Sequence, residues 1–241
     1  MESLMAVILA AGEGKRMKSN KAKVLHKICG KTFIERVYES VKGAGIDETI
    51  LVVGHKADQV QEHMKDSVSY VKQDVQLGTG HAVMQAEKYF ENKKGCVIVL
   101  CGDAPLITSK TISDAIEFHK NNGYSATVIT AEMEDPTGYG RIVRSADGNV
   151  VKIVEHRDAN EQERKIKEIN SGLYVFNIEN LVEALKMLDN NNDQGEYYLT
   201  DTIEILIKKG LKVGAVRAGD SSEVLGINDR VQLAKASEIL R

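Results

Sequence analysis

Short apolar runs alternate with amphipathic segments along the first half of the chain. Runs such as residues 5–10 are typical of strands buried on both faces of a parallel sheet. Apolar residues at helical spacing, such as Ile34, Val37 and Val41, predict helices that bury one face. The alternation predicts an α/β fold with a mostly parallel central sheet and helices on both faces. The predicted strands span residues 5–10, 49–53, 68–71 and 97–101, and the predicted helices span residues 32–43, 58–64, 79–90 and 109–120.

The pattern changes from Tyr124 onward, where strand-like segments follow one another before helices return. Asp147-Gly148 is a plausible hairpin turn within residues 141–154. No linker or internal repeat separates the halves, so we expect a single domain over residues 1–241. Its parts are a nucleotide-binding half over 1–123, a second-substrate half over 124–227 and a C-terminal helix over 228–241. Further strands are predicted over residues 125–132 and 170–177, and further helices over 178–188, 198–208 and 228–240.

Composition places the chain among soluble globular proteins. It has 241 residues, of which 42% are hydrophobic and 28% charged, and no apolar run approaches the roughly 20 residues that a membrane-spanning helix needs. The N-terminus lacks the basic segment and cleavage site of a secretory signal. Cys96 and Cys101, five positions apart on one predicted strand, point to opposite faces and are expected to be buried. We therefore expect a cytoplasmic protein without a membrane partner.

Charge is distributed unevenly along the chain. A net charge of −3 argues against a nucleic-acid-binding protein. Between Gly12 and Lys31, however, there are seven basic residues and one acid, Glu13. This segment predicts a site for an anionic ligand, with a solvated basic face as the alternative.

A glycine-rich turn follows the first predicted strand. Residues 9–17 contain Gly12 and Gly14, whose small size lets backbone N–H groups approach a phosphate or a base. The turn is not a Walker A loop. Met17 stands where the dinucleotide-binding fingerprint requires its third glycine, which disfavours a dehydrogenase.

A carboxylate follows the fourth predicted strand. Asp103, in Gly102-Asp103-Ala104-Pro105-Leu106, lies at the strand end where open α/β sheets bind ligands. Because Mg²⁺ commonly takes only one or two protein carboxylates, this residue is a candidate metal ligand. The alternative is an aspartate that caps the following turn.

Nine segments together resemble the uridyltransferase domain of the bacterial bifunctional N-acetylglucosamine-1-phosphate uridyltransferase/glucosamine-1-phosphate acetyltransferase family, over essentially the whole chain. Three strings are the most specific: Gln76-Leu77-Gly78-Thr79-Gly80-His81, Pro136-Thr137-Gly138-Tyr139-Gly140-Arg141 and Glu196-Tyr197-Tyr198-Leu199-Thr200-Asp201. The remaining similarity lies in residues 9–17, 23–26, 102–106, 153–156, 168–172 and 226–230, and in Gln73.

This resemblance implies a Rossmann-like nucleotide-diphospho-sugar transferase fold with a small β-rich sugar-binding insertion. It also implies the reaction of UTP with N-acetylglucosamine 1-phosphate, giving UDP-N-acetylglucosamine and pyrophosphate with Mg²⁺ as cofactor. The product would serve peptidoglycan and lipopolysaccharide precursor synthesis, and thereby cell shape.

The resemblance also assigns roles to individual residues. It implies that Arg16 and Lys23 face the phosphates and that Asp103 and Asn228 ligate Mg²⁺, with Arg16, Lys23 and Asp103 as the catalytic set. The implied substrate-binding residues are Leu9, Ala10, Ala11, Gly12 and Gln73 at the uracil and ribose, Gly78 and Thr79 beside the base, Gly140, Glu155 and Asn170 at the sugar, together with Lys23, Cys101, Gly102, Asp103 and Asn228.

The chain departs from the family pattern at three points. Ala22 replaces a usual proline, and Cys101 replaces a usually larger residue. No hexapeptide repeats of the family's trimerising β-helix begin before Arg241, so no acetyl transfer is expected. A monomer or weak dimer is expected for this chain, and a trimer for a full-length protein that carries the β-helix.

Two alternatives remain at this point. The first is a nucleotidyltransferase for another sugar 1-phosphate or base, which would differ near Gly140, Glu155 and Asn170. The second is a non-catalytic UDP-sugar sensor. A sensor would be expected to lose Arg16, Lys23 or Asp103, all of which are present.

Overall fold

A nine-stranded sheet forms the centre of the protein in the computed structural model, which describes residues 2–240. Its main path runs in the order β11-β7-β10-β6-β1-β4-β5, while β8 and β9 extend from β10 and a separate ribbon pairs β2 with β3. The strands are β1 (Ser3–Ala10), β2 (Lys27–Ile28), β3 (Lys31–Thr32), β4 (Glu48–Val53), β5 (Ser69–Lys72), β6 (Gly95–Cys101), β7 (Ala126–Glu132), β8 (Arg141–Arg144), β9 (Val150–Val154), β10 (Glu168–Asn177) and β11 (Val213–Arg217).

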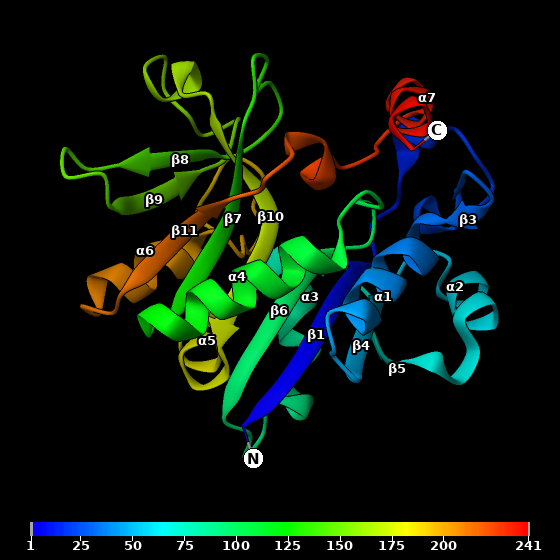
Figure 1. Ribbon diagram of the computed structural model, residues 1–241, viewed down its shortest axis with the longest axis horizontal. Coiled ribbons are helices and arrows are strands. Elements are labelled where there is room, and N and C mark those ends of the chain that lie inside the picture. Colours follow the sequence, from blue (N-terminus) through cyan, green and yellow to red (C-terminus); the bar gives the residue numbers. More distant parts are fainter. Residues whose placement is uncertain (1, 241) are drawn as a thin grey trace.

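The sheet is mostly parallel, as predicted. β1 lies between β4 and β6 and runs parallel to both, and β5 continues this direction beside β4. β10 is antiparallel to both of its neighbours on the main path, β6 and β7. The β8–β9 hairpin projects from the side of the sheet opposite to β4 and β5 (Figure 1). Because β1, β4, β5 and β6 run in the same direction, their carboxyl ends meet at one edge of the sheet.

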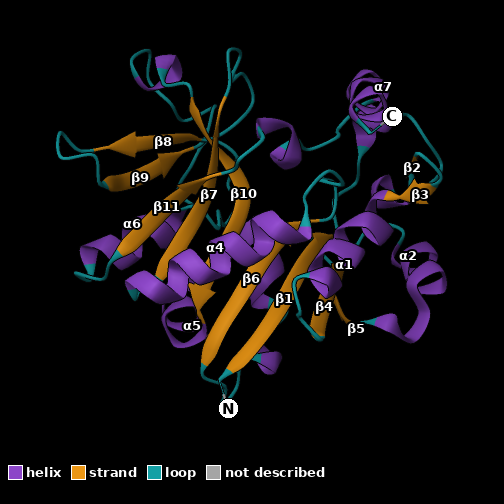
Figure 2. Cartoon of the chain, in the orientation of Figure 1, coloured by secondary structure: helices purple, strands orange, loops and turns teal. Residues whose placement is uncertain are grey.

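Helices cover both faces of this sheet. Alternate residues of β1 divide between two cores, with Ala6 and Ile8 facing one and Met5 and Val7 the other. α1 and α4 cover the first face and cross in front of the strands in Figure 2. Among residues 2–240, no helix combines the length and the hydrophobicity needed to cross a membrane. The helices are α1 (Phe33–Gly43), α2 (Ala57–Met64), α3 (Thr79–Met84), α4 (Ser109–Asn122), α5 (Ile178–Leu185), α6 (Asp201–Lys208) and α7 (Arg230–Ile239).

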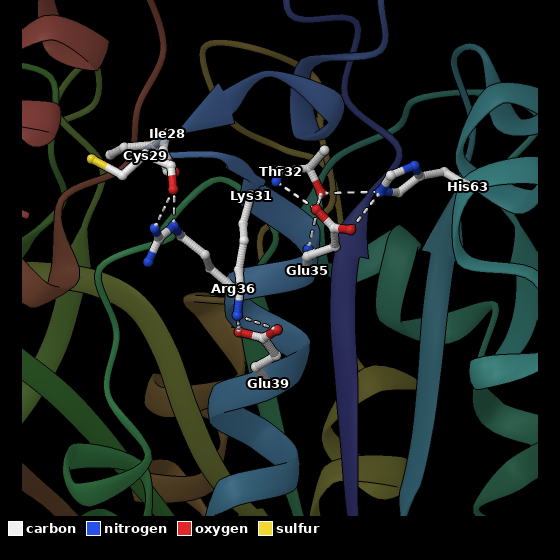
Figure 3. Close-up of polar contacts among 8 residues, drawn as sticks. All are labelled: Ile28, Cys29, Lys31, Thr32, Glu35, Arg36, Glu39 and His63. Carbon is white, nitrogen blue, oxygen red and sulfur yellow. Dashed lines mark hydrogen bonds and ion pairs between the residues drawn. The ribbon is translucent and has the colours of Figure 1, made fainter.

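The start of α1 is fixed by a reciprocal cap. The Thr32 hydroxyl accepts from the Glu35 backbone N–H at 3.2 Å, and the Glu35 carboxylate accepts from the Thr32 backbone N–H at 2.6 Å (Figure 3). The second bond lowers the pKa of Glu35. His63 of α2 lies 3.3 Å from the same carboxylate. The cap therefore also joins the first two helices.

α3, α5 and α6 are shorter than predicted, and α5 ends at Leu185 rather than at residue 188. α3 ends at Met84, and the chain continues to Phe90 through a 3₁₀ turn over Glu87–Tyr89. Ala86 and Phe90 are still buried, so the tighter turn satisfies the same apolar spacing. The helix expected from residue 198 begins at Asp201, because the Tyr197 backbone pairs with the loop before α3 instead.

Other differences concern the end of the chain and short strands. α7 begins at Arg230 rather than at residue 228, because Asp229 caps it by accepting from the Gln232 backbone N–H at 2.8 Å. β11 was not predicted and lies parallel to β7 at the sheet edge. The two-residue strands β2 and β3 were not predicted either.

A buried histidine makes the stability of this fold sensitive to acid. His119 of α4 lies with Nδ1 3.0 Å from the Thr127 hydroxyl, and burial lowers its pKa from 6.5 to about 4. Between these two values the unfolded chain holds a proton on this imidazole that the folded chain does not. The free energy of unfolding therefore falls as the pH drops from 6.5 toward 4.

We expect His119→Gln to remove about 3 kcal/mol of the stability difference between pH 7 and pH 4, since one pKa unit corresponds to about 1.4 kcal/mol. Denaturant unfolding of both proteins at the two pH values measures this difference. His55→Gln, at an exposed position, is the matched control. Equal pH dependence in wild type and His119→Gln would contradict the assignment.

Candidate active site

A cavity of about 300 Å³ lies at the edge where the parallel strands end. β1 leads into its glycine-rich wall, β5 leads to Gln73, and β6 leads to Cys101 and Asp103. A ligand at this place meets backbone groups from several strand ends, as is usual for open α/β sheets. The predicted site residues that line this nucleotide cavity are Leu9, Ala10, Ala11, Gly12, Lys23, Gln73, Gly78, Thr79, Cys101 and Asp103.

Gln73 presents a hydrogen-bond acceptor to this cavity. Its side-chain NH₂ donates to the Gly78 carbonyl at 3.0 Å and also lies 3.0 Å from His81 Nδ1. Both N–H groups are therefore engaged, and among residues 2–240 no hydrogen bond is donated to the side-chain oxygen Oε1. Gln73 is only 3% exposed, so this acceptor lies in a buried part of the cavity wall.

The loop that positions Gln73 depends on close backbone contacts. Gly78 has φ +102°, and a Cβ there would lie 2.6 Å from the Tyr197 carbonyl. Tyr197 donates its backbone N–H to Leu77 and accepts from Gly80, both at 2.8 Å. Only glycine fits at position 78, and the segment before α6 thereby braces the wall of the cavity around Gly78.

Three polar side chains converge beside the nucleotide cavity, and two of them, Lys23 and Asp103, line it. The Lys23 ammonium pairs with the Asp103 carboxylate and donates to Asn228 Oδ1 at 2.7 Å. The Asn228 amide is oriented by its NH₂, which donates to the Gly226 carbonyl at 3.2 Å. Two oxygen atoms from residues 125 positions apart in the sequence therefore face one positive charge.

This oxygen pair fits a divalent cation of the Mg²⁺ type. Such ions prefer oxygen ligands and often take only one or two from the protein. Asp103 supplies a carboxylate oxygen and Asn228 an amide oxygen. Both oxygens already contact one cation, the Lys23 ammonium. Within residues 2–240, no group of three or more His, Cys, Asp or Glu side chains is arranged to hold a metal.

A second, smaller cavity of about 190 Å³ adjoins the first. It contains Gly140, Glu155 and Asn170 and shares Leu9, Thr79 and Cys101 with the nucleotide cavity. Burial raises the pKa of Glu155, and the Thr200 hydroxyl donates to its carboxylate at 3.3 Å. Asn170 donates its backbone N–H to the Gly140 carbonyl at 2.9 Å. The predicted sugar-site residues therefore form one pocket, called the sugar cavity below.

Arg16 lies apart from Lys23. It is exposed on a 3₁₀ turn over Lys15–Met17 and lines a third cavity of about 440 Å³ together with Glu155 and His156. This cavity shares Gly138 and Glu155 with the sugar cavity. Arg16 therefore lines a cavity next to the sugar cavity and is not among the residues that line the nucleotide cavity.

Gly102 and Cys101, two further predicted residues, supply no reactive side chain to the site. Gly102 does not line the cavities, but its N–H donates to the Leu9 carbonyl at 2.9 Å and joins two strand ends. Burial raises the pKa of Cys101 to about 12, so this thiol is not a nucleophile at neutral pH. Unlike the buried Cys96, Cys101 is half-buried against the cavities.

Several lining residues were not predicted. Most of them stand inside the segments that carry the family resemblance, where no site role was assigned to them, whereas Tyr174 stands outside those segments in the apolar strand β10. They are Val24, Gln76, Ala82 and Glu196 at the nucleotide cavity, and Gly138, Tyr139, Ser171, Gly172, Tyr174, Leu199 and Thr200 at the sugar cavity.

Two curated relatives match this chain over nearly its whole length. The bifunctional protein GlmU of Acetivibrio thermocellus is 68% identical over all 241 residues, and that of Clostridium botulinum is 54% identical over 237 residues, or 98% of this chain. The chain spans 52% of the length of each of these relatives.

Fold comparison extends the likeness to a distant protein. A structure from Bacillus anthracis, assigned as a glucose-1-phosphate thymidylyltransferase, has a TM-score of 0.80 over 99% of this chain and 96% of its own, at 20% identity. The two proteins therefore share a fold. The sequence profile described as nucleotidyl transferase matches residues 5–221, most of the chain. This protein belongs to the nucleotidyl transferase family.

Proposed function

We propose that this chain transfers the uridylyl group of UTP to N-acetylglucosamine 1-phosphate and releases pyrophosphate. The observation that carries the proposal is the meeting of Lys23, Asp103 and Asn228 at a nucleotide cavity that shares a wall with the sugar cavity. The likeness to the GlmU proteins supports these substrates. The product, UDP-N-acetylglucosamine, would serve peptidoglycan and lipopolysaccharide precursor synthesis.

The residues provide positioning and charge neutralisation for this reaction. An oxygen of the sugar phosphate attacks the α-phosphorus of UTP, and the bond to the pyrophosphate oxygen breaks. Lys23 and Arg16 oppose the negative charge that develops on the phosphates. Asp103 and Asn228 would hold Mg²⁺, which when bound supplies further charge neutralisation. Glu155 and Asn170 orient the sugar through its hydroxyl and acetamido groups.

The side-chain oxygen of Gln73 favours uracil over cytosine. Uracil presents an N3–H donor to this acceptor, whereas cytosine presents an unprotonated nitrogen that leaves Gln73 Oε1 without a partner. We expect UTP to exceed CTP in kcat/KM by about 10²-fold, because a site built around one hydrogen bond rejects ligands that cannot form it. Gln73→Leu should bring the ratio close to one. An unchanged UTP-to-CTP ratio in Gln73→Leu would refute this role.

A division of labour along the chain is part of the proposal. We propose that residues 1–123 hold the nucleotide, that residues 124–227 hold the sugar phosphate, and that residues 228–241 close the phosphate side. A cytoplasmic monomer or weak dimer is part of the same proposal. The proposal covers uridyl transfer alone, because these 241 residues contain no hexapeptide repeats.

A panel of substrates tests the proposal. The protein is incubated with UTP, Mg²⁺ and one of several sugar 1-phosphates while pyrophosphate is measured. We expect N-acetylglucosamine 1-phosphate to give the highest kcat/KM. Preference for glucose 1-phosphate would favour another sugar nucleotidyltransferase. Binding of UDP-sugar without any pyrophosphate release would favour a sensor, although Arg16, Lys23 and Asp103 are all present.

A further inference from the structure

A buried tyrosine lies against the sugar cavity. Tyr174, in the middle of β10, is 2% exposed, and its ring stacks on Phe176 with centroids 5.5 Å apart. It lines the sugar cavity together with Glu155, Asn170 and Thr200. Along the sequence this tyrosine is part of an ordinary apolar strand.

An irregularity in β10 brings Tyr174 to the residue that the motifs place at the sugar. Residues four apart in a regular strand are separated by about 13 Å along its axis. Here the pairing of β10 with β7 shifts register between Asn170 and Leu173, and Gly172 adopts φ +79°. The Asn170 NH₂ consequently donates to the Tyr174 hydroxyl at 2.6 Å.

The hydrogen bonds around this pair leave one donor for a ligand. The Asn170 side-chain oxygen accepts from the Gly172 backbone N–H at 3.1 Å, which fixes the orientation of the amide. The Tyr174 oxygen accepts from that amide, so its own proton must point to another acceptor. Among residues 2–240 no hydrogen bond from this hydroxyl is present. A buried tyrosine O–H usually has an acceptor, and the adjoining cavity is where one can enter.

The surroundings keep this hydroxyl protonated. Burial and the nearby Glu155 carboxylate raise the pKa of Tyr174 well above its usual value of 10. The group is therefore a donor at every pH at which the protein works. The Cys101 thiol donates to the Gly172 carbonyl at 3.5 Å. It therefore does not donate to the Tyr174 oxygen.

We propose that Tyr174 determines the specificity of the sugar cavity, where its hydroxyl donates a hydrogen bond to an acceptor oxygen of the sugar and holds the Asn170 amide in place. The inference rests on the proposed function and deepens it, since it assigns a sugar-recognising donor outside the sequence motifs. Tyr174 contributes to ground-state binding of the sugar, and the phosphoryl-transfer step is left to Lys23, Arg16 and Asp103.

Tyr174→Phe tests the proposal, because phenylalanine keeps the ring on Phe176 and removes only the hydroxyl. We expect the KM for the sugar 1-phosphate to rise about tenfold, the usual effect of losing one hydrogen bond to a ligand. The kcat and the KM for UTP should change less than about twofold, as expected when an interaction shared by ground and transition states is lost. Unchanged UTP kinetics also show that the variant is folded.

The matched control is Tyr38→Phe. Its hydroxyl donates to the Ser67 carbonyl at 3.0 Å, away from the cavities, so all kinetic constants should stay at wild-type values. Sugar analogues then locate the partner atom. Tyr174→Phe and the analogue that lacks the contacted oxygen should show non-additive losses, whereas other deoxy analogues should show additive ones.

Calorimetric binding of UDP-N-acetylglucosamine separates this inference from the proposed function. If the wild type makes pyrophosphate and Tyr174→Phe has an unchanged sugar KM, the inference is wrong and the function stands. If the wild type makes no pyrophosphate but Tyr174→Phe binds the UDP-sugar about tenfold more weakly, the function is wrong and the inference stands. No binding by the wild type would overturn both.

Discussion

Asp103→Asn is expected to reduce kcat/KM for pyrophosphate release by about 10³-fold, at the upper end of what single electrostatic groups in active sites contribute. The substitution removes the one carboxylate that faces the Lys23 ammonium and the candidate cation position beside Asn228. Asn228→Ala removes only a neutral oxygen and should have a smaller effect. Initial rates measured across a Mg²⁺ titration, together with thermal unfolding, test this expectation.

The control for charge removal is Asp47→Asn, because this carboxylate is 95% exposed and pairs with Lys42 on the surface. It should retain wild-type rates. Full activity of Asp103→Ala would contradict the assignment of Asp103 as a metal ligand. An unchanged rate of pyrophosphate release by the wild type in excess chelator would contradict it as well.

Lys23→Ala and Arg16→Ala are expected to lower kcat by about 10²–10³-fold, with smaller changes in the KM for the sugar phosphate. Their proposed role is to stabilise charge that grows as the pyrophosphate bond breaks, so the loss should be concentrated in the transition state. Lys23 lines the nucleotide cavity and Arg16 lines the third cavity, so the two residues act at different places and both single variants should be impaired. Pre-steady-state measurement of pyrophosphate formation gives the rate of the chemical step.

Lys15→Ala provides the comparison within the same basic segment. Its side chain is 84% exposed and pairs with Glu13, so its loss should leave both constants unchanged. If Lys23→Ala and Arg16→Ala behave like Lys15→Ala, the basic segment is a solvated face and the phosphates are held elsewhere.

The strand ends that build the nucleotide cavity were predictable from sequence for a physical reason. A strand buried on both faces must be continuously apolar, so residues 5–10 and 97–101 stand out without any knowledge of their neighbours. The residues just beyond them, including Asp103, then fall at the ligand-binding edge of the sheet. The roles of Gly78 and Gln73, in contrast, came only from the family resemblance.

The remaining features of the fold and site depend on tertiary contacts, which the local pattern of apolar and polar residues does not specify. The apolar spacing of α3 is satisfied equally by a helix and by a 3₁₀ turn, so its end at Met84 was not evident. β11 is an edge strand whose partner, β7, is distant in sequence. Tyr174 fits a strand core as well as it fits a binding site, and only the register shift beside Gly172 distinguishes the two.

The contact between Lys23 and Asn228 also has a consequence for biosynthesis. The two residues are 205 positions apart, and Arg230, the first residue of α7, donates to the carbonyl of Met17 at 3.3 Å. As the chain leaves the ribosome, β1, β4, β5 and β6 are available for pairing long before Asn228 has been made. A nascent chain that has formed the nucleotide cavity therefore still lacks its last phosphate-side residue. On the proposed function, uridylyl transfer would begin only after Asn228 has joined Lys23 and Asp103.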